Sequence, residues 1–450
     1  MRKLLRPIDK RPLEYLITSF VRFARLESSA SIVLLLAATA AVVLANSRIA
    51  PAYEVLLNIP IHFSVGTVAI SWTIHDCVND LLMALFFLVI GLEVKRELVI
   101  GELASLRRAL LPMLAALGGV LTPIAIYLTL NHENSAEMGW GVPIATDVAF
   151  SLAVLALFGR RIPIGLKVFL VTLAIVDDIA GVLVIAIAYT DRLHFGYLAL
   201  VALIVLFCLA LNWFGVKRLS IYMTAGIALW CAVRVSGLHP TVAGILLAMT
   251  IPAQVSIQSK AFLGRGGVQL PAVAQPPKQL HSIRTSTELY ESPLDRLQAM
   301  LHPWVSFGIV PLFAITNADI SVRAIHFDPV FRPVFWGILL GLLVGKPLGI
   351  TLFSWTAVRL RLAELPRGIT WAQLHAVSWL GGIGFTVSIF IAGLAFEEQQ
   401  RYAIARIAVC IASLIAAGIG ASLLALNLAS EKVDVTEVSP AGQMRWSSEK

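Results

Sequence analysis

The sequence predicts an all-α polytopic membrane protein with twelve transmembrane helices, and two observations predict this class. Of the 450 residues, 58% are apolar and 14% are charged, whereas soluble domains carry about 25% charged residues. Windows of roughly 20 nearly uncharged residues, the length that spans the hydrocarbon core of a bilayer, recur along the chain. This composition excludes a soluble globule and a disordered chain.

The cysteine and charge content exclude further classes of function. The four cysteines are dispersed along the chain and lack the spacing of metal ligands, so neither a disulfide framework nor a zinc site is expected. The net charge of +8 matters less than the position of each basic residue relative to the spans. We therefore expect no nucleic-acid partner.

The spans follow one another in the order in which the apolar windows occur. They are predicted at 28–46, 76–94, 109–130, 138–158, 165–189, 195–213, 219–236, 240–252, 300–318, 333–357, 371–395 and 403–427. The N-terminus and every second loop hold 27 of the 35 Lys and Arg, the alternate loops hold seven, and the last one is Lys346. Because basic loops stay in the cytoplasm, both termini are expected there.

Four segments lie outside the spans. Residues 1–27 are expected to form a cytoplasmic N-terminus with an amphipathic surface helix. Residues 58–73 alternate in polarity around a glycine turn, which predicts an external β-hairpin. Residues 253–292 are rich in Gln, Ser, Pro and Gly and are typical of a mobile cytoplasmic insertion. Residues 428–450 are expected to form the cytoplasmic tail, which leaves 28–427 as the twelve-helix domain.

Four charged residues fall near the middle of predicted spans, where hydrocarbon makes them costly. They are Asp147 in the fourth span, Asp177 and Asp178 in the fifth, and Lys346 in the tenth. Each opposes insertion by about 2.5 to 3.5 kcal/mol. One interpretation is an internal ion-pair network that only fixes helix packing. Three acids against one base leave a surplus of carboxylates, however, and this surplus favours a functional site.

A surplus carboxylate at this depth has two alternative occupants. It holds a proton, because burial favours the neutral form, or it holds a small hard cation whose hydration shell its oxygens replace. The two occupants exclude each other. Adjacent helical residues point about 100° apart, so one of Asp177 and Asp178 is expected to face an ion cavity while the other reaches Lys346.

Two spans carry residues that interrupt a helix. In the fourth, Pro143 removes an amide donor shortly before Thr146 and Asp147. In the eleventh, the interruption is expected at the central glycines Gly381, Gly382 and Gly384. The distribution of Lys and Arg between the loops predicts that these two spans cross the membrane in opposite directions. Spans 3–5 and 10–12 are therefore expected to form an inverted pair. Kinked but continuous helices are the alternative. Broken ends would expose amides that suit Asp147 and carbonyls that suit Lys346.

The tenth span carries a glycine at every fourth position. These residues are Gly337, Gly341, Gly345 and Gly349. A stripe of this kind lets two helix backbones approach closely. We therefore expect it to press Lys346 against a neighbouring helix.

Three functions besides the binding of a cation or a proton at these carboxylates have to be considered. Proton-coupled uptake of an organic solute would require polar or aromatic groups at the midplane, and no aromatic or Arg-rich cluster falls there. An intramembrane aspartyl protease needs two carboxylates that face each other from separate helices, whereas Asp177 and Asp178 are neighbours. A channel needs a continuous pore.

Six motifs closely resemble those of the NhaA-type sodium/proton antiporters, and the resemblance runs from about Glu27 to Asn427. The motifs are Gly91–Leu98, Ala145–Phe150, Ala174–Ile179, Leu301–Trp304, Gly345–Ile350 and Gly382–Thr386. The chain departs from the family at Gln298, Ala299 and Met300, where relatives carry acidic and His side chains, and in the length of the 253–292 insertion.

The resemblance implies a secondary transporter of the bacterial inner membrane, not an enzyme, with no cofactor. It implies electrogenic, pH-regulated exchange of cytoplasmic Na⁺ or Li⁺ for external H⁺ by alternating access, in the service of pH homeostasis and salt tolerance. It also implies inverted repeats whose two broken helices cross near the midplane. In the family a hairpin like 58–73 pairs two protomers, which implies a homodimer.

The resemblance further implies roles for particular residues. Asp177 and Asp178 would carry the cation and the protons, with Asp178 as the direct ligand, and Asp177 would pair with Lys346 when the ion is absent. Asp147 and Thr146 would shape the crossing together with the glycines of the eleventh span, and Thr146 would lend an oxygen to the ion.

The pH response has three candidate residues. The resemblance places Glu93 and Glu97 at a pH-responsive cytoplasmic entrance. His239, before Pro240 in the eighth span, is a further candidate, although a lone His is more often a hydrogen-bonded core residue.

Overall fold

The computed structural model describes residues 27–65, 68–132, 134–190, 193–253, 292–318, 332–366 and 368–437. Three predicted features fall on other residues. The surface helix within 1–27, nearly all of the 253–292 insertion and the last part of the 428–450 tail lie outside the described residues.

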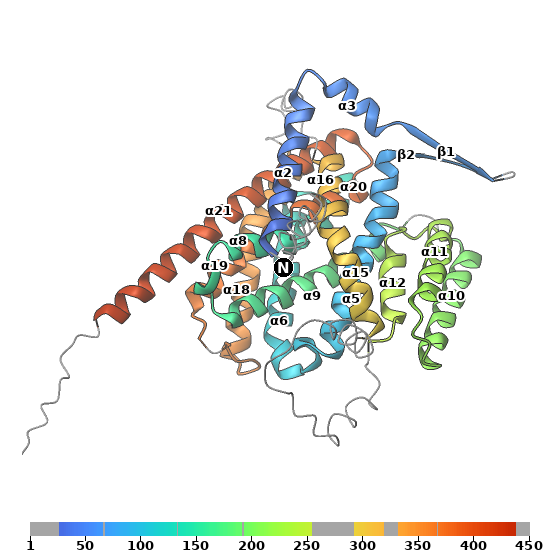
Figure 1. The fold of residues 1–450 in the computed structure, drawn as a ribbon. Helices are drawn as coiled ribbons and strands as arrows, with labels where there is room; N and C mark the ends of the chain where they lie inside the picture. The colour runs from blue at the N-terminus through green and yellow to red at the C-terminus, as the bar shows by residue number, and fades with distance from the viewer. Residues whose placement is uncertain are drawn as a thin grey trace, which may run out of the picture.

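The described chain is mainly helical (Figure 1). Before the insertion the helices are α2 (Glu27–Asn46), α3 (Ala50–Leu57), α4 (Ile74–Asp76), α5 (Met83–Val99), α6 (Leu106–Leu130), α7 (Asn134–Glu137), α8 (Val148–Ala156), α9 (Ile164–Ala188), α10 (Phe195–Trp213), α11 (Leu219–Ser236) and α12 (Val242–Thr250). After it they are α15 (Pro293–Trp304), α16 (Val310–Asn317), α17 (Pro333–Leu340), α18 (Lys346–Arg359), α19 (Trp371–Leu380), α20 (Phe385–Ala395) and α21 (Gln399–Glu437).

Several helices are joined by tighter or wider helical turns. Wider π-helical turns at Cys77–Leu82, Val305–Ile309 and Gly341–Gly345 lead into α5, α16 and α18. Narrower 3₁₀ segments occupy Glu102–Ala104, Met138–Ile144 and Gly159–Arg161. The π turn before α18 ends at Gly345, directly before Lys346, and such turns often mark functional positions.

The predicted membrane spans all fall on helices. Ten described helical segments are long and apolar enough to cross a membrane, and the bent pair α19 and α20 makes an eleventh. The remaining predicted span, 240–252, contains α12, whose nine residues reach only about 13 Å at 1.5 Å per residue. At the other extreme α21 continues to Glu437, ten residues past its predicted end.

The predicted β-hairpin is confirmed. Strands β1 (Pro60–Val65) and β2 (Val68–Thr73) pair antiparallel, with Pro60 opposite Thr73 and Val65 opposite Val68. The Thr73 side chain then accepts a hydrogen bond from the Asp76 amide and starts the next helical segment. Figure 1 shows the hairpin projecting sideways from one end of the helical bundle.

The two predicted interruptions are also confirmed. The fourth span is a 3₁₀ segment, Met138–Ile144, followed by non-helical Ala145–Asp147 and then α8. In the eleventh, α19 ends at Leu380 and α20 starts at Phe385, with a bend of 48° between them. Each broken span is the middle member of a helix triple: α6, the α8 span and α9 in one, and the α17–α18 span, the α19–α20 span and α21 in the other.

The glycine stripe of the tenth span packs as the sequence predicts. A Cβ added at Gly345 would lie 2.8 Å from the Pro123 Cα, and one at Gly349 would lie 2.6 Å from the Gly118 carbonyl carbon. Pro123 and Gly118 both belong to α6. The α17–α18 span and α6 therefore touch backbone to backbone, and this contact fixes the depth of Lys346.

We expect Gly349→Ala to lower the thermal unfolding midpoint of the detergent-solubilised protein. The new methyl group would press on the α6 backbone, which cannot move aside cheaply, and overpacking of this kind costs about 1 to 3 kcal/mol. Gly418→Ala is the matched control, because a Cβ there meets no atom within 4 Å. Equal unfolding midpoints for the two variants would show that the close approach is not needed.

Candidate functional site

An ion pair between α9 and α18 lies where the two helix triples meet. Asp177 and Lys346 are both fully buried, and the Lys346 ammonium bonds the Asp177 carboxylate. The Lys346 Nζ also donates to the Thr146 hydroxyl at 3.0 Å. That hydroxyl lies 2.8 Å from Asp177 Oδ2 and 2.7 Å from the Gly381 carbonyl. Since a hydroxyl has one proton, Thr146 donates to one of these two acceptors at a time.

Asp147 joins the amide ends of the two broken helices. Its Oδ1 accepts from the Phe150 amide at 3.0 Å, which makes it the N-cap of α8. Its Oδ2 accepts from the Thr386 amide at 3.2 Å and the Thr386 hydroxyl at 2.6 Å, at the start of α20. The expected match between this carboxylate and the positive helix ends is therefore present.

The carbonyl ends at the crossing are bound by hydroxyls and one amide instead of by Lys346. Ser151 Oγ donates to the Leu380 carbonyl at 2.8 Å, and the Asp147 amide donates to the Ile383 carbonyl at 2.6 Å. The expectation that Lys346 would serve these carbonyls was wrong, because its described hydrogen bonds go to Thr146 and Asp177. The hydroxyls leave the ammonium available to Asp177.

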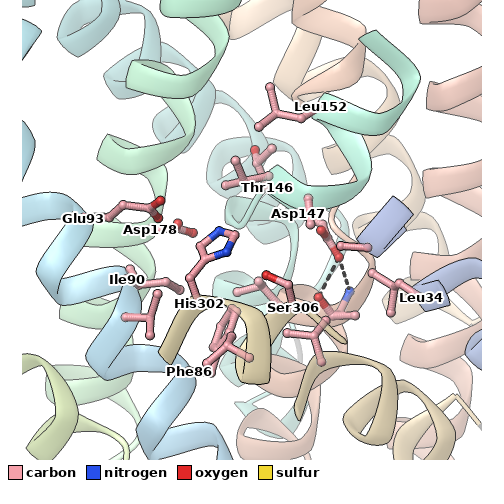
Figure 2. Close-up of a pocket in the computed structure, with 18 residues that line it drawn as sticks. Leu34, Phe86, Ile90, Glu93, Thr146, Asp147, Leu152, Asp178, His302 and Ser306 are labelled. Atoms are coloured by element: carbon pink, nitrogen blue, oxygen red, sulfur yellow. Dashed lines mark hydrogen bonds between the residues drawn. The ribbon is translucent and has the colours of Figure 1, made fainter. Parts of the chain in front are cut away.

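Asp178 points away from its neighbour and into a cavity of about 160 Å³. The polar residues that line this cavity are Glu93, Thr146, Asp147, Asp178, His302, Ser306 and Thr386. Figure 2 shows the side chains of Glu93, Asp178 and His302 pointing into the same space. Asp178 is only 7% exposed, so its carboxyl group is largely shielded from bulk water.

The charges at this depth do not cancel. Asp147 is held by helix amides and Asp177 by Lys346, whereas Asp178 makes no ion pair within the described part of the chain. Asp178 Oδ1 and Asp177 Oδ1 are both buried without a hydrogen-bond partner there. An uncompensated buried carboxylate is costly, so Asp178 requires either a proton or a cation.

The three other candidate residues lie in three different places. Glu93 lines the Asp178 cavity and accepts a 3.4 Å hydrogen bond from Gln298. Glu97 lines a separate surface cavity and accepts from the Glu102 amide at 3.0 Å. His239 bonds the Thr241 hydroxyl at 2.9 Å and lines a third cavity next to the hairpin end of the bundle, together with Asp80.

His302 is a residue of the site that was not predicted from the sequence, although it belongs to the Leu301–Trp304 motif. The structure places the His302 ring in the Asp178 cavity (Figure 2). The sequence feature that could have indicated this role is the spacing of four residues between Gln298, His302 and Ser306. This spacing puts the three side chains on one face of a helical segment.

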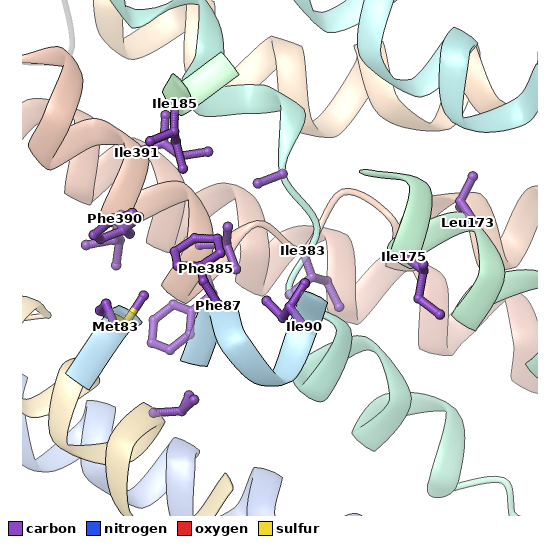
Figure 3. Close-up of a cluster of buried hydrophobic side chains, with 14 of the residues drawn as sticks. Met83, Phe87, Ile90, Leu173, Ile175, Ile185, Ile383, Phe385, Phe390 and Ile391 are labelled. Atoms are coloured by element: carbon purple, nitrogen blue, oxygen red, sulfur yellow. The ribbon is translucent and has the colours of Figure 1, made fainter. Parts of the chain in front are cut away.

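An apolar cluster separates the Asp178 cavity from the His239 cavity. The rings of Phe87 and Phe390 lie 5.5 Å apart between their centroids, and Phe313 packs on Phe390 at 6.1 Å. The rings of His239 and Phe390 form an edge-to-face pair with their centroids 5.5 Å apart. Figure 3 shows Met83, Phe87 and Phe390 near one another within the buried apolar core. The Asp178 cavity and the His239 cavity share no lining residue in the described structure.

Comparison with known proteins finds close relatives over nearly the whole chain. A family model described as Na⁺/H⁺ antiporter 1 matches residues 21–424. A Na(+)/H(+) antiporter NhaA of Koribacter versatilis is 43% identical over 437 residues, covering 96% of each chain. The protein of the same name from Oleidesulfovibrio alaskensis is 42% identical over 92% of this chain and 94% of its own. That of Escherichia coli O1:K1 is 41% identical over 90% of this chain and 98% of its own.

Proposed function

Because the chain belongs to the Na⁺/H⁺ antiporter 1 family, we propose that it exchanges cytoplasmic Na⁺ or Li⁺ for external H⁺ at Asp177 and Asp178. One observation carries the proposal. Asp178 is a buried carboxylate with no cationic partner among the described residues, and it faces a cavity. Such a group is stable only with a proton or a cation bound, and exchange of one for the other is antiport.

Ion binding starts from the cavity. The distribution of basic residues along the sequence puts the Glu93 end of α5 in the cytoplasm and the hairpin outside. Both termini are then cytoplasmic, and the Asp178 cavity receives ions from the cytoplasm of a bacterial inner-membrane protein. A Na⁺ ion that loses its water needs oxygen ligands. Asp178 supplies them first, and the unpaired Asp177 Oδ1 and the Thr146 hydroxyl lie next to it along the same crossing.

Two protons can leave when the cation enters. One comes from Asp178. A second comes from the Asp177–Lys346 pair, because a cation that engages Asp177 weakens its attraction for the ammonium. Loss of two protons for one Na⁺ moves net charge across the membrane, so the exchange is electrogenic. External protons later displace the ion when the site faces outward.

Alternating access follows from the apolar cluster around Phe87 and Phe390. In the described arrangement this cluster closes the path from Asp178 to the His239 cavity. A state open to the outside requires these rings to separate while the cytoplasmic cavity closes. The helix breaks at Asp147 and Gly381 are where the backbone can change direction at low cost.

The cavity argues against the rival functions. Its volume of about 160 Å³ is below the roughly 300 Å³ at which pockets for organic ligands begin. Asp177 and Asp178 face different partners, so they form no protease dyad. The packing of Phe390 against Phe87 and Phe313 supports a closed path over a continuous pore.

The purified full-length chain in proteoliposomes tests the proposal. With a pH dye inside, Na⁺ and Li⁺ should each produce an internal pH change, and K⁺ should not. Dissipating the membrane potential with a K⁺ ionophore should increase the rate if the exchange is electrogenic. Ion flux without proton movement, or no response to either ion, would contradict the assignment.

We further propose that Glu93, in the Asp178 cavity, and Glu97, in the separate surface cavity, both belong to the pH-responsive cytoplasmic entrance. Glu93→Gln should move the pH of half-maximal exchange to a lower value, because one negative charge in the Asp178 cavity is lost. Glu54→Gln, on α3 outside this cavity, is the control and should leave the profile unchanged. The test is the rate of exchange at saturating Na⁺, measured as a function of pH. An unchanged pH profile for Glu93→Gln would show that Glu93 does not contribute to the pH response.

We propose that the hairpin pairs two protomers. A two-stranded sheet leaves both outer edges without backbone partners, and such edges pair readily with a second copy. Replacing residues 61–72 by a short polar linker should convert the dimer to a monomer that still exchanges ions. Mass measurement by light scattering in detergent reports the state, and a persistent dimer would point to a different interface.

A further inference from the structure

A polar cluster between α18 and α19 takes no part in the exchange proposed above. It consists of Thr351 on α18 and of His375, Ser378 and Trp379 on α19. His375 Nδ1 lies 2.9 Å from the Thr351 hydroxyl, and the Trp379 indole nitrogen lies 3.2 Å from His375 Nε2. The Thr351 hydroxyl is 3.1 Å from Ser378 Oγ, which donates to the His375 carbonyl at 2.6 Å.

These contacts admit one direction of donation. The Trp379 N–H only donates, so His375 Nε2 must accept and the proton of a neutral ring must sit on Nδ1. Nδ1–H then donates to Thr351, the Thr351 hydroxyl donates to Ser378, and Ser378 donates to the backbone. Every proton in the chain is used once. A proton added at Nε2 would set two N–H groups against each other, and the His375 ring or the Trp379 ring would have to move.

The cluster links the two parts of the ion site that come from the second helix triple. Thr351 lies on the same helix as Lys346, five residues further on. Ser378 and Trp379 precede the end of α19, where the Leu380 carbonyl accepts from Ser151 and the Gly381 carbonyl accepts from Thr146. A shift of α19 against α18 therefore moves Thr146 relative to Lys346.

No charged group competes for His375 in the described part of the chain. Its partners are the neutral side chains already named, and the ion pairs of the described residues leave it out. The last part of α21 carries Glu431, Lys432, Asp434 and Glu437. Among the residues whose side chains are described, the charged ones on the packed helices are Lys346 and Arg359 on α18, Lys167, Asp177 and Asp178 on α9, and Arg401 and Arg406 on α21. None of these described side chains bonds the ring.

We propose that His375 is a positioning residue for the ion site, and that its neutral ring holds α18 and α19 in the register that the site requires. Protonation of Nε2 breaks the Trp379 bond, displaces the ring from Thr351 and loosens the register. Exchange then falls on acidification, as the ring takes up a proton. This inference rests on the proposed Na⁺/H⁺ exchange for its transport readout only.

His375→Gln tests the titration, because Gln keeps hydrogen-bonding groups and cannot be protonated in this range. Exchange by this variant should persist to lower pH than exchange by the wild type. The pH at which exchange falls to half on acidification should be lower by about half to one unit, a shift that corresponds to the free energy of one hydrogen bond. His194→Gln, an exposed His at the start of α10, is the control and should follow the wild type.

Thr351 tests the link between the helices. Thr351→Val removes the hydroxyl and should raise the Na⁺ concentration for half-maximal exchange at every pH, whereas Thr351→Ser should restore the wild-type value. The double variant Thr351→Val with His375→Gln should have the pH profile of Thr351→Val alone. Additive effects of the two substitutions would overturn the relay, as would a wild-type profile and Na⁺ dependence in His375→Gln.

Thermal unfolding without Na⁺ separates this inference from the proposed function. From about pH 7.5 to 5.5 the wild-type midpoint should fall more than that of His375→Gln, whether or not the protein transports Na⁺. Parallel falls would refute the His375 relay even with exchange intact. A wild type that shows the differential fall but no Na⁺-driven exchange would refute the proposed function and leave the relay supported. If His375→Gln does not fold, the Thr351→Val and Thr351→Ser pair still decides.

Discussion

Asp178→Asn is expected to abolish Na⁺- and Li⁺-driven exchange while the protein stays folded. The carboxylate faces the cavity, has an oxygen without a hydrogen-bond partner and pairs with no described cation. An amide there can balance neither a cation nor a transported proton. We expect the exchange rate to fall at least about 100-fold, the factor that corresponds to roughly 2.7 kcal/mol.

The stability of Asp178→Asn should match or exceed that of the wild type. A buried charge without a partner is destabilising, so replacing it by a neutral amide removes that cost. Asp177→Asn should behave differently, because it leaves the buried Lys346 ammonium without its partner. Dye-based exchange and thermal unfolding in detergent measure both effects.

The control for Asp178→Asn is Glu364→Gln. Glu364 makes an ion pair with Arg107 in which both side chains are more than four-fifths exposed, and surface pairs of this kind contribute little. It should leave exchange and unfolding unchanged. Exchange at the wild-type rate in Asp178→Asn would refute Asp178 as the ion ligand.

The sequence predicted the helical spans because hydrocarbon imposes a length and a composition on every segment that crosses it. The same rule does not predict the short length of α12 or the position at which α21 ends. The nine-residue α12 lies in an apolar window that a full span would also produce, since the turn at His239 to Thr241 carries no charge. The end of α21 was placed where the apolar run stops, although a helix can continue into water.

The divergence of Asp177 and Asp178 was predictable because helix geometry separates neighbours by about 100°. The partners of the broken carbonyl ends were not. Ser151 and Leu380 are 229 residues apart, and Thr146 and Gly381 are 235 apart, so nothing local in the sequence indicates that these groups meet. The π turn at Gly341–Gly345 was also missed, because glycines spaced by four fit an ordinary helix equally well.

Lys346→Ala is expected to lower the thermal unfolding midpoint and to impair exchange. It leaves Asp177 buried without a cation, and the carboxylate should then take up a proton in place of its ion pair. Thr146 also loses the donor on one side of its hydroxyl. Lys217→Ala, an exposed Lys between α10 and α11, should change neither quantity.

Lys346→Arg then separates two roles that Lys346→Ala removes together. Arginine keeps the positive charge against Asp177 but does not give up its proton in proteins. If Lys346 only supports structure, Arg should restore both the unfolding midpoint and electrogenic exchange. If Lys346 carries a transported proton, Arg should restore the midpoint while the current per Na⁺ or the proton coupling stays impaired. Wild-type unfolding and exchange in Lys346→Ala would exclude both roles, because a fully buried carboxylate would then tolerate the loss of its described cationic partner.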